Sequence, residues 1–351
     1  TYIHRTIKTK FRIGDKYMKL IIPMAGRGTR VRPHSHTVPK PLLPVAGTMI
    51  IERLVETFTR TLDRKIDEIV YILGPDFGQD IKDQLTAMSD RQDAKTTFRV
   101  QFPALGTAHA VACANEDLEG EVIVAFADTL FDSKEKFNLD GADSVIWLKK
   151  VEDPSRFGVA VHEGEKITGF VEKPKEFISD LAIIGVYYFK DGQELKRQVN
   201  RVMDEGLKGP GGEYFLTAAL DNMINEGKIF KIATVDEWLD CGTLPAWLET
   251  TGEIVAKENP TFDASRFPGC TINEPVFIDA NVTIENSTIG PKVSIESGTV
   301  IKNSTIENTI IRDNASLEDV VTSGSTIGAY TVLKNIKGKV DVGDHSTLEI
   351  D

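Results

Sequence analysis

The chain has 351 residues, 41% of them hydrophobic and 27% charged, a globular composition in a length that exceeds one ordinary core, so we expect two domains. Its formal net charge of −12 should repel nucleic acid and anionic membrane surfaces, so an anionic substrate would need a local basic site. Cys113, Cys241 and Cys270 are too few and too widely spaced for a disulfide framework or a cysteine metal site, which favours a reducing, cytoplasmic setting.

Residues 1–18 are interpreted as a basic, solvated N-terminal tail. Lysines and arginines outnumber the acidic residue Asp15 there, but the apolar core of a signal peptide is missing. A targeting or nucleic-acid-binding arm is the alternative, although basic runs this short are usually only solvated. No apolar run in the sequence approaches the roughly 18 to 20 residues that a membrane-spanning helix needs.

From residue 19 to residue 255, apolar strands alternate with amphipathic helices. The pattern predicts strands over 20–22, 68–73, 98–101 and 122–126, with helices around 50–58 and 81–85 and another from residue 106. This alternation is typical of a Rossmann-like, layered α/β domain with a mainly parallel sheet. Ligands of such sheets bind at the carboxyl ends of the strands, so the residues just after each apolar run are the first candidates for a site.

The pattern changes after residue 255. Residues 256–268 are polar and contain prolines, which indicates a linker. Over residues 269–351, β-branched and other apolar anchors recur at steps near six: Ile278, Ile284, Ile289, Ile295, Ile301, Ile306, Ile311, Leu317, Val321, Ile327 and Leu333. A β-sandwich would show period-two alternation and Asn-Gly or Asp-Gly hairpins, and neither occurs here. The segment is therefore predicted to be a short left-handed parallel β-helix of hexapeptide turns, with about four coils.

A glycine-rich, basic loop follows the first predicted strand. From Gly26 to Lys40 it contains arginines but no acidic residue. Glycines let backbone N–H groups approach phosphate oxygens, and the cations neutralise phosphate charge. A dinucleotide-binding loop would need glycine in place of Val31, and a Walker loop would need Gly-Lys-Ser/Thr. A structural turn with solvated cations is the alternative, and His34 and His36 are interpreted as incidental or as weak phosphate contacts.

Six motifs occur in order along the predicted α/β domain. They are Gly26-Arg27-Gly28-Thr29-Arg30 with Pro39-Lys40-Pro41, Leu105–Ala110 shortly after Val100-Gln101, Val124–Asp128, Asp153–Gly158, Phe170–Lys175 and Trp238–Thr243. Together they make the sequence similar to the nucleotide-sugar pyrophosphorylases. It looks like the branch that holds the glucose-1-phosphate thymidylyltransferases, with uridylyl- and mannose-1-phosphate guanylyl-transferring relatives near by. The resemblance covers about residues 19–255.

The resemblance implies a sugar-1-phosphate nucleotidyltransferase that uses Mg²⁺ and takes dTTP or UTP with glucose 1-phosphate. It implies that Arg30 holds the leaving pyrophosphate, Lys40 the triphosphate and Lys173 the sugar phosphate. Asp128 and Asp240 are expected to share the Mg²⁺ through hard oxygen ligands. The remaining expected contacts are Ala25, Gly26, Gly28, Thr29, Gln101, Gly106 and Thr107 with the nucleotide, and Gly158, Glu172 and Ile183 with the sugar phosphate.

Two departures from the family leave the base and the sugar open. Pro23-Met24-Ala25-Gly26 stands where thymidylyl members more often read Leu-Ala-Gly-Gly, and Ile184 stands where many have threonine. The alternatives are a mannose-1-phosphate guanylyltransferase, a bifunctional enzyme whose β-helix is an acetyltransferase, and a non-catalytic nucleotide-sugar sensor. Acetyl transfer generally needs a histidine base between coils, and His345 is the sole histidine after residue 162. We therefore expect the β-helix to join copies of the chain into a homo-oligomer, without nucleic-acid or membrane partners.

Overall fold

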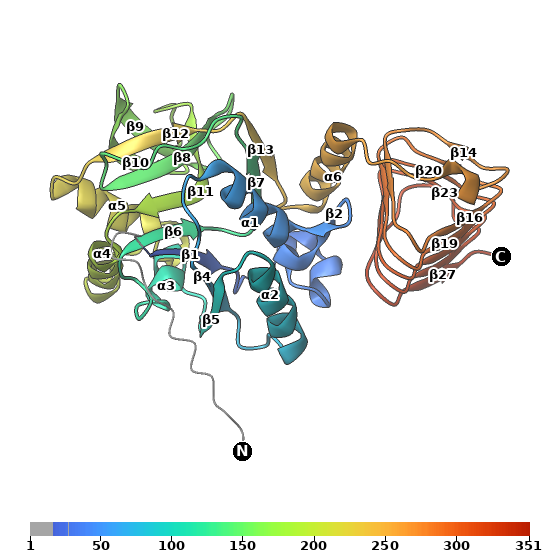
Figure 1. The fold of residues 1–351 in the computed structure, drawn as a ribbon, viewed down its shortest axis with the longest axis horizontal. Helices are drawn as coiled ribbons and strands as arrows, with labels where there is room; N and C mark the ends of the chain where they lie inside the picture. The colour runs from blue at the N-terminus through green and yellow to red at the C-terminus, as the bar shows by residue number, and fades with distance from the viewer. Residues whose placement is uncertain (1–16, 27) are drawn as a thin grey trace, which may run out of the picture.

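Four parallel strands form one half of a nine-stranded sheet in the computed structural model, which describes residues 17–26 and 28–351 (Figure 1). The basic tail predicted for residues 1–18 lies almost wholly outside the described residues. The four strands are β1 (Met18–Pro23), β4 (Glu68–Leu73), β5 (Lys95–Val100) and β6 (Glu121–Ala125), in the order β5-β4-β1-β6. Every residue of β1, β4 and β6 is buried, as expected for parallel strands covered on both faces.

The second half of the sheet is mixed in direction. Strand β11 (Leu181–Phe189) runs antiparallel to both β6 and β8 (Ser144–Lys150), and β12 (Phe230–Thr234) runs parallel to β8. The hairpin of β9 (Gly158–Glu163) and β10 (Lys166–Glu172) completes the sheet. The α/β fold class is confirmed, but the sheet is less parallel than the sequence pattern predicted. Periodicity reports burial on a strand and carries no information on its direction.

Helices cover both faces of the sheet. One core contains residues of α1 (Ile50–Thr61), α2 (Gln79–Arg91) and α6 (Leu244–Glu258), and it includes Trp247. The other contains residues of α3 (Thr107–Ala112), α4 (Gly192–Asp204) and α5 (Leu216–Asn225). The apolar side of α1 predicted from the sequence, Ile50 to Phe58, is fully buried. The sheet is thus the middle of three layers.

The remaining short elements of this part lie in its connections. They are the single 3₁₀ turns η1 (Thr29–Val31), η2 (His34–His36), η3 (Lys40–Leu42), η4 (Pro210–Gly212) and η5 (Ala264–Arg266), the pair β2 (Pro44–Val45) and β3 (Thr48–Met49), and the ribbon of β7 (Thr129–Asp132) and β13 (Glu237–Asp240). In the described part of the chain, no helix combines the length and the apolar character of a membrane span.

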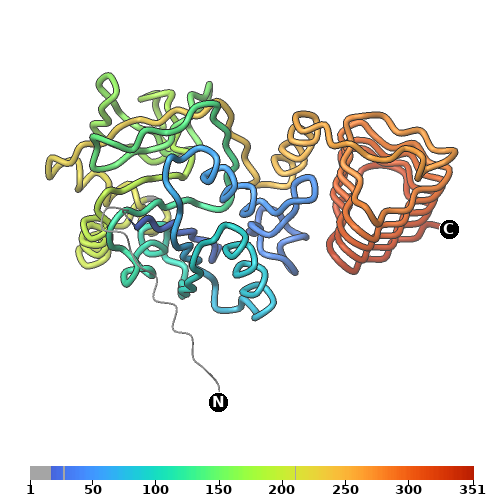
Figure 2. The backbone as a smooth tube through the Cα atoms, viewed as in Figure 1, coloured from blue at the N-terminus to red at the C-terminus, as the bar shows by residue number. Residues whose placement is uncertain are grey.

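The C-terminal part is a parallel β-helix with three walls, seen as stacked coils in Figure 2. Sheet D is β14 (Thr271–Ile272), β17 (Thr288–Ile289), β20 (Thr305–Glu307) and β23 (Val321–Ser323). Sheet E is β15 (Val276–Ile278), β18 (Val293–Ile295), β21 (Ile310–Ile311), β24 (Thr326–Ile327) and β26 (Asp341–Val342). Sheet F is β16 (Thr283–Glu285), β19 (Val300–Lys302), β22 (Ser316–Glu318), β25 (Val332–Lys334) and β27 (Thr347–Glu349). Two walls have five strands, one more than the four coils expected.

The repeat in the sequence explains how the coils stack. Nearly all of the predicted anchors are buried inside the prism, whereas Val321 is 46% exposed and Thr322 beside it is buried. One corner is lined in successive coils by Asn286, Asn303, Asp319 and Asn335, all with positive φ. Asn and Asp adopt this left-handed conformation at a lower free-energy cost than most residues, so they let the chain turn from sheet F to sheet D.

Candidate active site

A cavity of about 260 Å³ lies at the carboxyl edge of the parallel strands. The chain reaches it directly after β1, β5 and β6, because the carboxyl ends of parallel strands share one edge of the sheet. The predicted nucleotide residues that line it are Ala25, Gly26, Gly28, Gln101, Gly106 and Thr107, together with Lys40 and Asp128. Thr29 and Arg30 lie next to this lining, in η1.

The basic loop folds back on itself beside the cavity. Gly28 has φ of 57°, and a Cβ there would lie 3.0 Å from Cβ of Lys40, so glycine permits both the turn and the close approach. The Ser35 hydroxyl donates to the Gly28 carbonyl at 2.7 Å. The two ends of the loop, far apart in sequence, therefore form one wall of the cavity.

A lysine and an aspartate pair across this cavity. Lys40 Nζ donates to Asp128 Oδ2 at 2.8 Å; the Lys40 side chain is 13% exposed and the Asp128 side chain 38% exposed. Burial alone would raise the pKa of Asp128, but Lys40 and Arg30 outweigh it and hold that pKa below its ordinary value. The carboxylate is thus charged at neutral pH and still open to a ligand.

The ribbon of β7 and β13 brings the second aspartate to the same place. Its register sets Asp240 opposite Thr129, and the Cys241 amide donates to the Asp128 carbonyl at 3.1 Å. Asp240 Oδ1 accepts from the Gly242 amide at 2.8 Å, and a Cβ on Gly242 would lie 3.3 Å from Arg30 Nη2. Asp128, Asp240, Lys40 and Arg30 therefore form one charged cluster.

These carboxylates suit a hard divalent cation. Each has one oxygen engaged by the protein, Asp128 by Lys40 and Asp240 by Gly242, and a second oxygen to offer. Within residues 17–26 and 28–351, no group of three His, Cys, Asp or Glu side chains gathers to hold an ion. A cation here would take its remaining ligands from phosphate oxygens and water, as Mg²⁺ commonly does.

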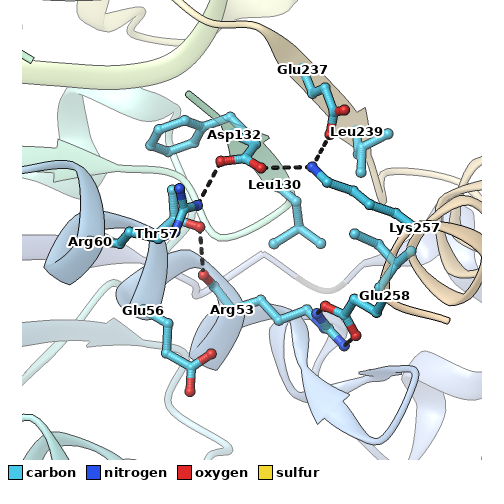
Figure 3. A pocket seen from close by; sticks show the side chains of 12 residues that line it. Arg53, Glu56, Thr57, Arg60, Leu130, Asp132, Glu237, Leu239, Lys257 and Glu258 are labelled. Carbon is cyan, nitrogen blue, oxygen red and sulfur yellow. Dashed lines mark hydrogen bonds and ion pairs between the residues drawn. The ribbon is translucent and has the colours of Figure 1, made fainter. Parts of the chain in front are cut away.

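The far end of the ribbon lines a second hollow of about 550 Å³, shown in Figure 3. Lys257 Nζ lies 2.6 Å from both Asp132 Oδ2 and Glu237 Oε2, and Arg60 donates to Asp132 at 2.6 Å. These acidic and basic side chains neutralise one another, so the hollow has no excess positive charge that would attract an anion. The ion pairs hold strands β7 and β13 against helices α1 and α6, behind Asp128 and Asp240.

Gln101 is held in a fixed orientation at the other end of the cavity. It is 6% exposed, and its Nε2 donates to the Gly106 carbonyl and to His109 Nδ1, each at 3.2 Å. Burial lowers the pKa of His109, so its neutral ring can accept this hydrogen bond. The amide oxygen of Gln101 is left as an acceptor for a bound ligand.

The predicted sugar-side residues converge on three strands. Gly158 begins β9, opposite Glu172 at the end of β10, and a Cβ on Gly158 would lie 3.0 Å from Glu172 Oε2 and 3.2 Å from Ile183 Cδ1. Burial raises the pKa of Glu172, Lys173 opposes this rise and Glu213 adds to it. Lys173 itself is exposed, with Nζ 6.0 Å from the Phe215 ring centroid.

Glu213 is a lining residue that the sequence interpretation missed. It directly precedes Tyr214, whose backbone packs so closely on Gly106 that a Cβ there would lie 2.5 Å from the Tyr214 carbonyl oxygen. The glycine- and proline-rich stretch at 209–212 marks a loop before an acidic residue, which was the available signal.

The interpretation of His34 was wrong. It is fully buried against Trp247, with ring centroids 5.1 Å apart, and its ring faces the β-helix. It is therefore neither incidental nor a phosphate contact. His36 lies beside a larger hollow of about 830 Å³ that adjoins the nucleotide cavity at Ala25 and Gln101.

Comparisons with known proteins agree with this geometry. The nucleotidyl transferase family matches residues 19–257. Bifunctional protein GlmU of Methanococcus maripaludis is 31% identical over 230 residues, which cover 64% of this chain and 51% of that protein. The glucose-1-phosphate thymidylyltransferase of Streptomyces griseus is 26% identical over 367 residues and aligns over 95% of this chain and 99% of its own. A solved structure of UDP-glucose pyrophosphorylase complexed with UDP-glucose shares the fold over 69% of this chain and 99% of that chain, with a TM-score of 0.57 and 22% identity.

The fold defines a layered α/β protein with a cavity at the carboxyl edge of its parallel strands. With more than half of its length matched, the chain belongs to the nucleotidyl transferase family. It spans about half the length of the bifunctional relatives that it matches.

Proposed function

We propose that the protein is a sugar-1-phosphate nucleotidyltransferase, which converts a nucleoside triphosphate and a sugar 1-phosphate into a nucleotide sugar and pyrophosphate. The observation that carries the proposal is the charged cluster of Lys40, Arg30, Asp128 and Asp240 beside the cavity of about 260 Å³. In this reaction an oxygen of the sugar phosphate attacks the α-phosphorus, and the bond from that phosphorus to the oxygen bridging to the β-phosphate breaks. Two anions must meet, so charge neutralisation and alignment dominate the catalysis.

The residues divide between the two substrates. Lys40 and Arg30 neutralise the triphosphate, with Arg30 on the leaving pyrophosphate, while Gln101 and the backbone around Ala25, Gly26 and Gly106 receive the base. Gly158, Glu172 and Ile183 contact the sugar, and Lys173 binds its phosphate. The convergence of Gly158, Glu172 and Ile183 supports this division, because these residues lie on strands β9 to β11, away from the basic loop.

Asp128 and Asp240 would hold one Mg²⁺, supported by their place at the same end of the ribbon and by the charged state of Asp128. The ion would supply further charge neutralisation at the phosphates. The role of Lys40 in the ligand-free protein is then to keep the Asp128 carboxylate ionised and in place.

For the substrates we propose dTTP or UTP with glucose 1-phosphate, with mannose 1-phosphate and GTP as the alternative pair. The free acceptor oxygen of Gln101 suits an N–H of thymine, uracil or guanine better than the N3 acceptor of cytosine. Pyrophosphate release, measured for the four triphosphates against several sugar 1-phosphates, tests both the reaction and the pair. No release from any combination would refute the proposal.

The same protein serves to test the remaining proposals. We infer a cytoplasmic homo-oligomer that associates through its β-helix, since the β-helix carries exposed apolar side chains at Val321 and Tyr330. Analytical ultracentrifugation would contradict this with a single species of monomer mass. Acetyl transfer from acetyl-coenzyme A to an amino sugar phosphate would establish the bifunctional alternative instead.

A further inference from the structure

The second half of the basic loop and the β2–β3 turn that follows it are bound on one side by the β-helix. Figure 1 shows β2 beside the β-helix coils. A Cβ on Gly343 would lie 3.0 Å from Cβ of Pro33, and the Gly47 amide donates to Glu296 Oε1 at 3.2 Å. Between these two contacts the chain carries Lys40. Residues 33–47 are therefore held between the α/β sheet and sheet E of the β-helix.

One hydrogen bond joins the loop to the last coils directly. The Thr37 hydroxyl donates to Asp344 Oδ2 at 2.6 Å. The other oxygen of Asp344 accepts from Arg312 Nη1 at 2.7 Å and from the Ala329 amide at 2.8 Å. Asp344 is thus fixed from within the β-helix and presents a single oxygen to the loop.

The pair of Arg312 and Asp344 is buried, with side chains 7% and 5% exposed. The attraction within a buried ion pair offsets little more than the free energy needed to remove the two charges from water. Such a pair is therefore weak evidence for stabilisation and better evidence for a fixed geometry. Among the described residues, the only hydrogen bond from this pair to a residue outside the β-helix is the one between Asp344 and Thr37. The pair therefore fixes the position of the oxygen that Asp344 presents to the loop.

His34 makes the same surface of the loop rigid. Its ring is fully buried, and neither nitrogen has a hydrogen bond of ordinary geometry, although the Thr326 backbone is close enough to act on its pKa. Burial and the charge of Arg312 lower the pKa of His34 to about 4. The neutral ring packs edge-on against Trp247, whose Nε1 donates to the Pro44 carbonyl at 2.8 Å. His34 therefore acts as an apolar anchor between loop, helix α6 and β-helix.

We propose that Asp344, held by Arg312, is a positioning residue for nucleotidyl transfer, and that the β-helix is a structural support for the phosphate-binding loop. The path runs from Asp344 to Thr37, and from there along three residues to Lys40, which contacts Asp128. Ser35 closes the path by its bond to Gly28 on the other end of the loop. This inference rests on the proposed function, since it assigns the loop to the triphosphate.

The test uses the full chain and removes the hydroxyl without changing the shape of the side chain. In Thr37→Val we expect the KM for the triphosphate to rise about tenfold, the usual size of a lost hydrogen bond to a charged group. Thr37→Ser keeps the hydroxyl and should restore the wild-type KM. The KM for the sugar 1-phosphate should change by less than about twofold in both, because its residues lie on other strands.

Asp344→Asn supplies the second arm, with melting temperature as the check that the chain folds. It should raise the same KM. The double variant with Thr37→Val should be no worse than the more severe single one, because both substitutions remove the same hydrogen bond between Thr37 and Asp344, and Thr37→Val also removes the 3.2 Å contact of the hydroxyl with the His34 carbonyl. Glu318→Gln is the matched control. It breaks the 3.6 Å pair with Lys334 on sheet F and should change neither KM.

The outcomes separate this inference from the proposed function. If the wild type is active and both Thr37→Val and Asp344→Asn keep the triphosphate KM within about twofold, the support role is refuted. If the wild type releases no pyrophosphate from any substrate pair, the proposed function fails. Amide hydrogen exchange then tests the support of the loop by the β-helix without reference to activity. Unchanged exchange over residues 34–42 in both variants would then refute the support, and faster exchange would uphold it.

Discussion

At the scale of single residues, Asp128 and Asp240 are far apart in the sequence but lie in one charged cluster in the structure. Each lies beside a strand of one ribbon, and the register of that ribbon sets them at the same end. An aspartate after a strand is usually a turn former, so neither position would stand out alone. Their joint position beside Lys40 and Arg30 places two carboxylates in one charged cluster.

We expect Asp128→Asn and Asp240→Asn each to lower turnover by about a thousandfold or more, because losing a ligand charge at a phosphate-bound cation costs several kcal/mol. Both variants should fold, since neither side chain is in an apolar core. Steady-state pyrophosphate release in Mg²⁺, with circular dichroism for the fold, measures this. Wild-type activity of either variant would disprove the metal assignment.

Arg30 and Lys173 are expected to serve different substrates. Arg30→Ala should weaken use of the triphosphate, whereas Lys173→Ala should weaken use of the sugar 1-phosphate, each by about tenfold to a hundredfold as for a lost charged contact. The reason is their separation, since Arg30 lies by Asp240 and Lys173 by Phe215. Two-substrate kinetics would show the difference, and the same pattern in both variants would mean that the site is not divided in this way.

At the scale of elements, the β2–β3 turn contacts the end of strand β18 through one carboxyl group, that of Glu296. Glu296 is 5% exposed and follows β18; it accepts from the Gly47 amide and from Ser294. Burial raises its pKa to about 7, Asp313 and Asp279 add to this rise, and the two hydrogen bonds oppose it. A group whose pKa is raised on folding stabilises the folded state at low pH, and this stabilisation is lost as pH rises through the folded value.

The expected result is that Glu296→Gln gains stability over the wild type as pH rises from 5 to 8. With a shift from 4.5 to about 7, the change between the two ends of this range is about 2 to 3 kcal/mol. His34 titrates equally in both proteins, so its effect cancels in the difference. Melting temperatures measured across this range would give the answer, and a difference independent of pH would show that Glu296 is not the group responsible.

At the scale of the whole molecule, the β-helix is part of the protein around the site as well as a candidate for assembly. Ile310 of β21 belongs to the same core as Trp247 of α6, and Phe277 packs so closely on the β2–β3 turn that a Cβ on Gly47 would lie within 3.0 Å of its ring. The two parts therefore share buried apolar surface, which stabilises each of them.

A chain ended after Asn259 should consequently melt at a lower temperature than the full chain and have a higher triphosphate KM. Removing the β-helix exposes apolar surface around Trp247 and takes away Asp344 and Glu296, which hold the loop and the turn. Calorimetry and kinetics on the two chains would measure both effects. Equal melting temperatures would mean that the parts are independent, and light scattering on the same samples would report on self-association.

The sequence by itself determined the elements and the chemistry of the loop. Buried strands such as β1 and β4 and the buried face of α1 follow from local apolar periodicity, and the β-helix follows from anchors repeated at short, regular intervals. Gly26 to Lys40 is basic and glycine-rich whatever surrounds it, so a phosphate-binding role could be predicted without coordinates.

Only the tertiary structure decided which distant residues act together. The mixed strand directions in the second half of the sheet, the convergence of Gly158 with Ile183, and the contact of Thr37 with Asp344 depend on packing between segments far apart in the chain. His34 looked like a loop histidine because its neighbours in sequence are polar and basic, whereas its neighbours in space are Trp247 and Arg312. Periodicity and motif spacing act over a few residues, but burial and pairing are set by the whole fold, so the contacts between the basic loop and the β-helix could not be predicted from the sequence.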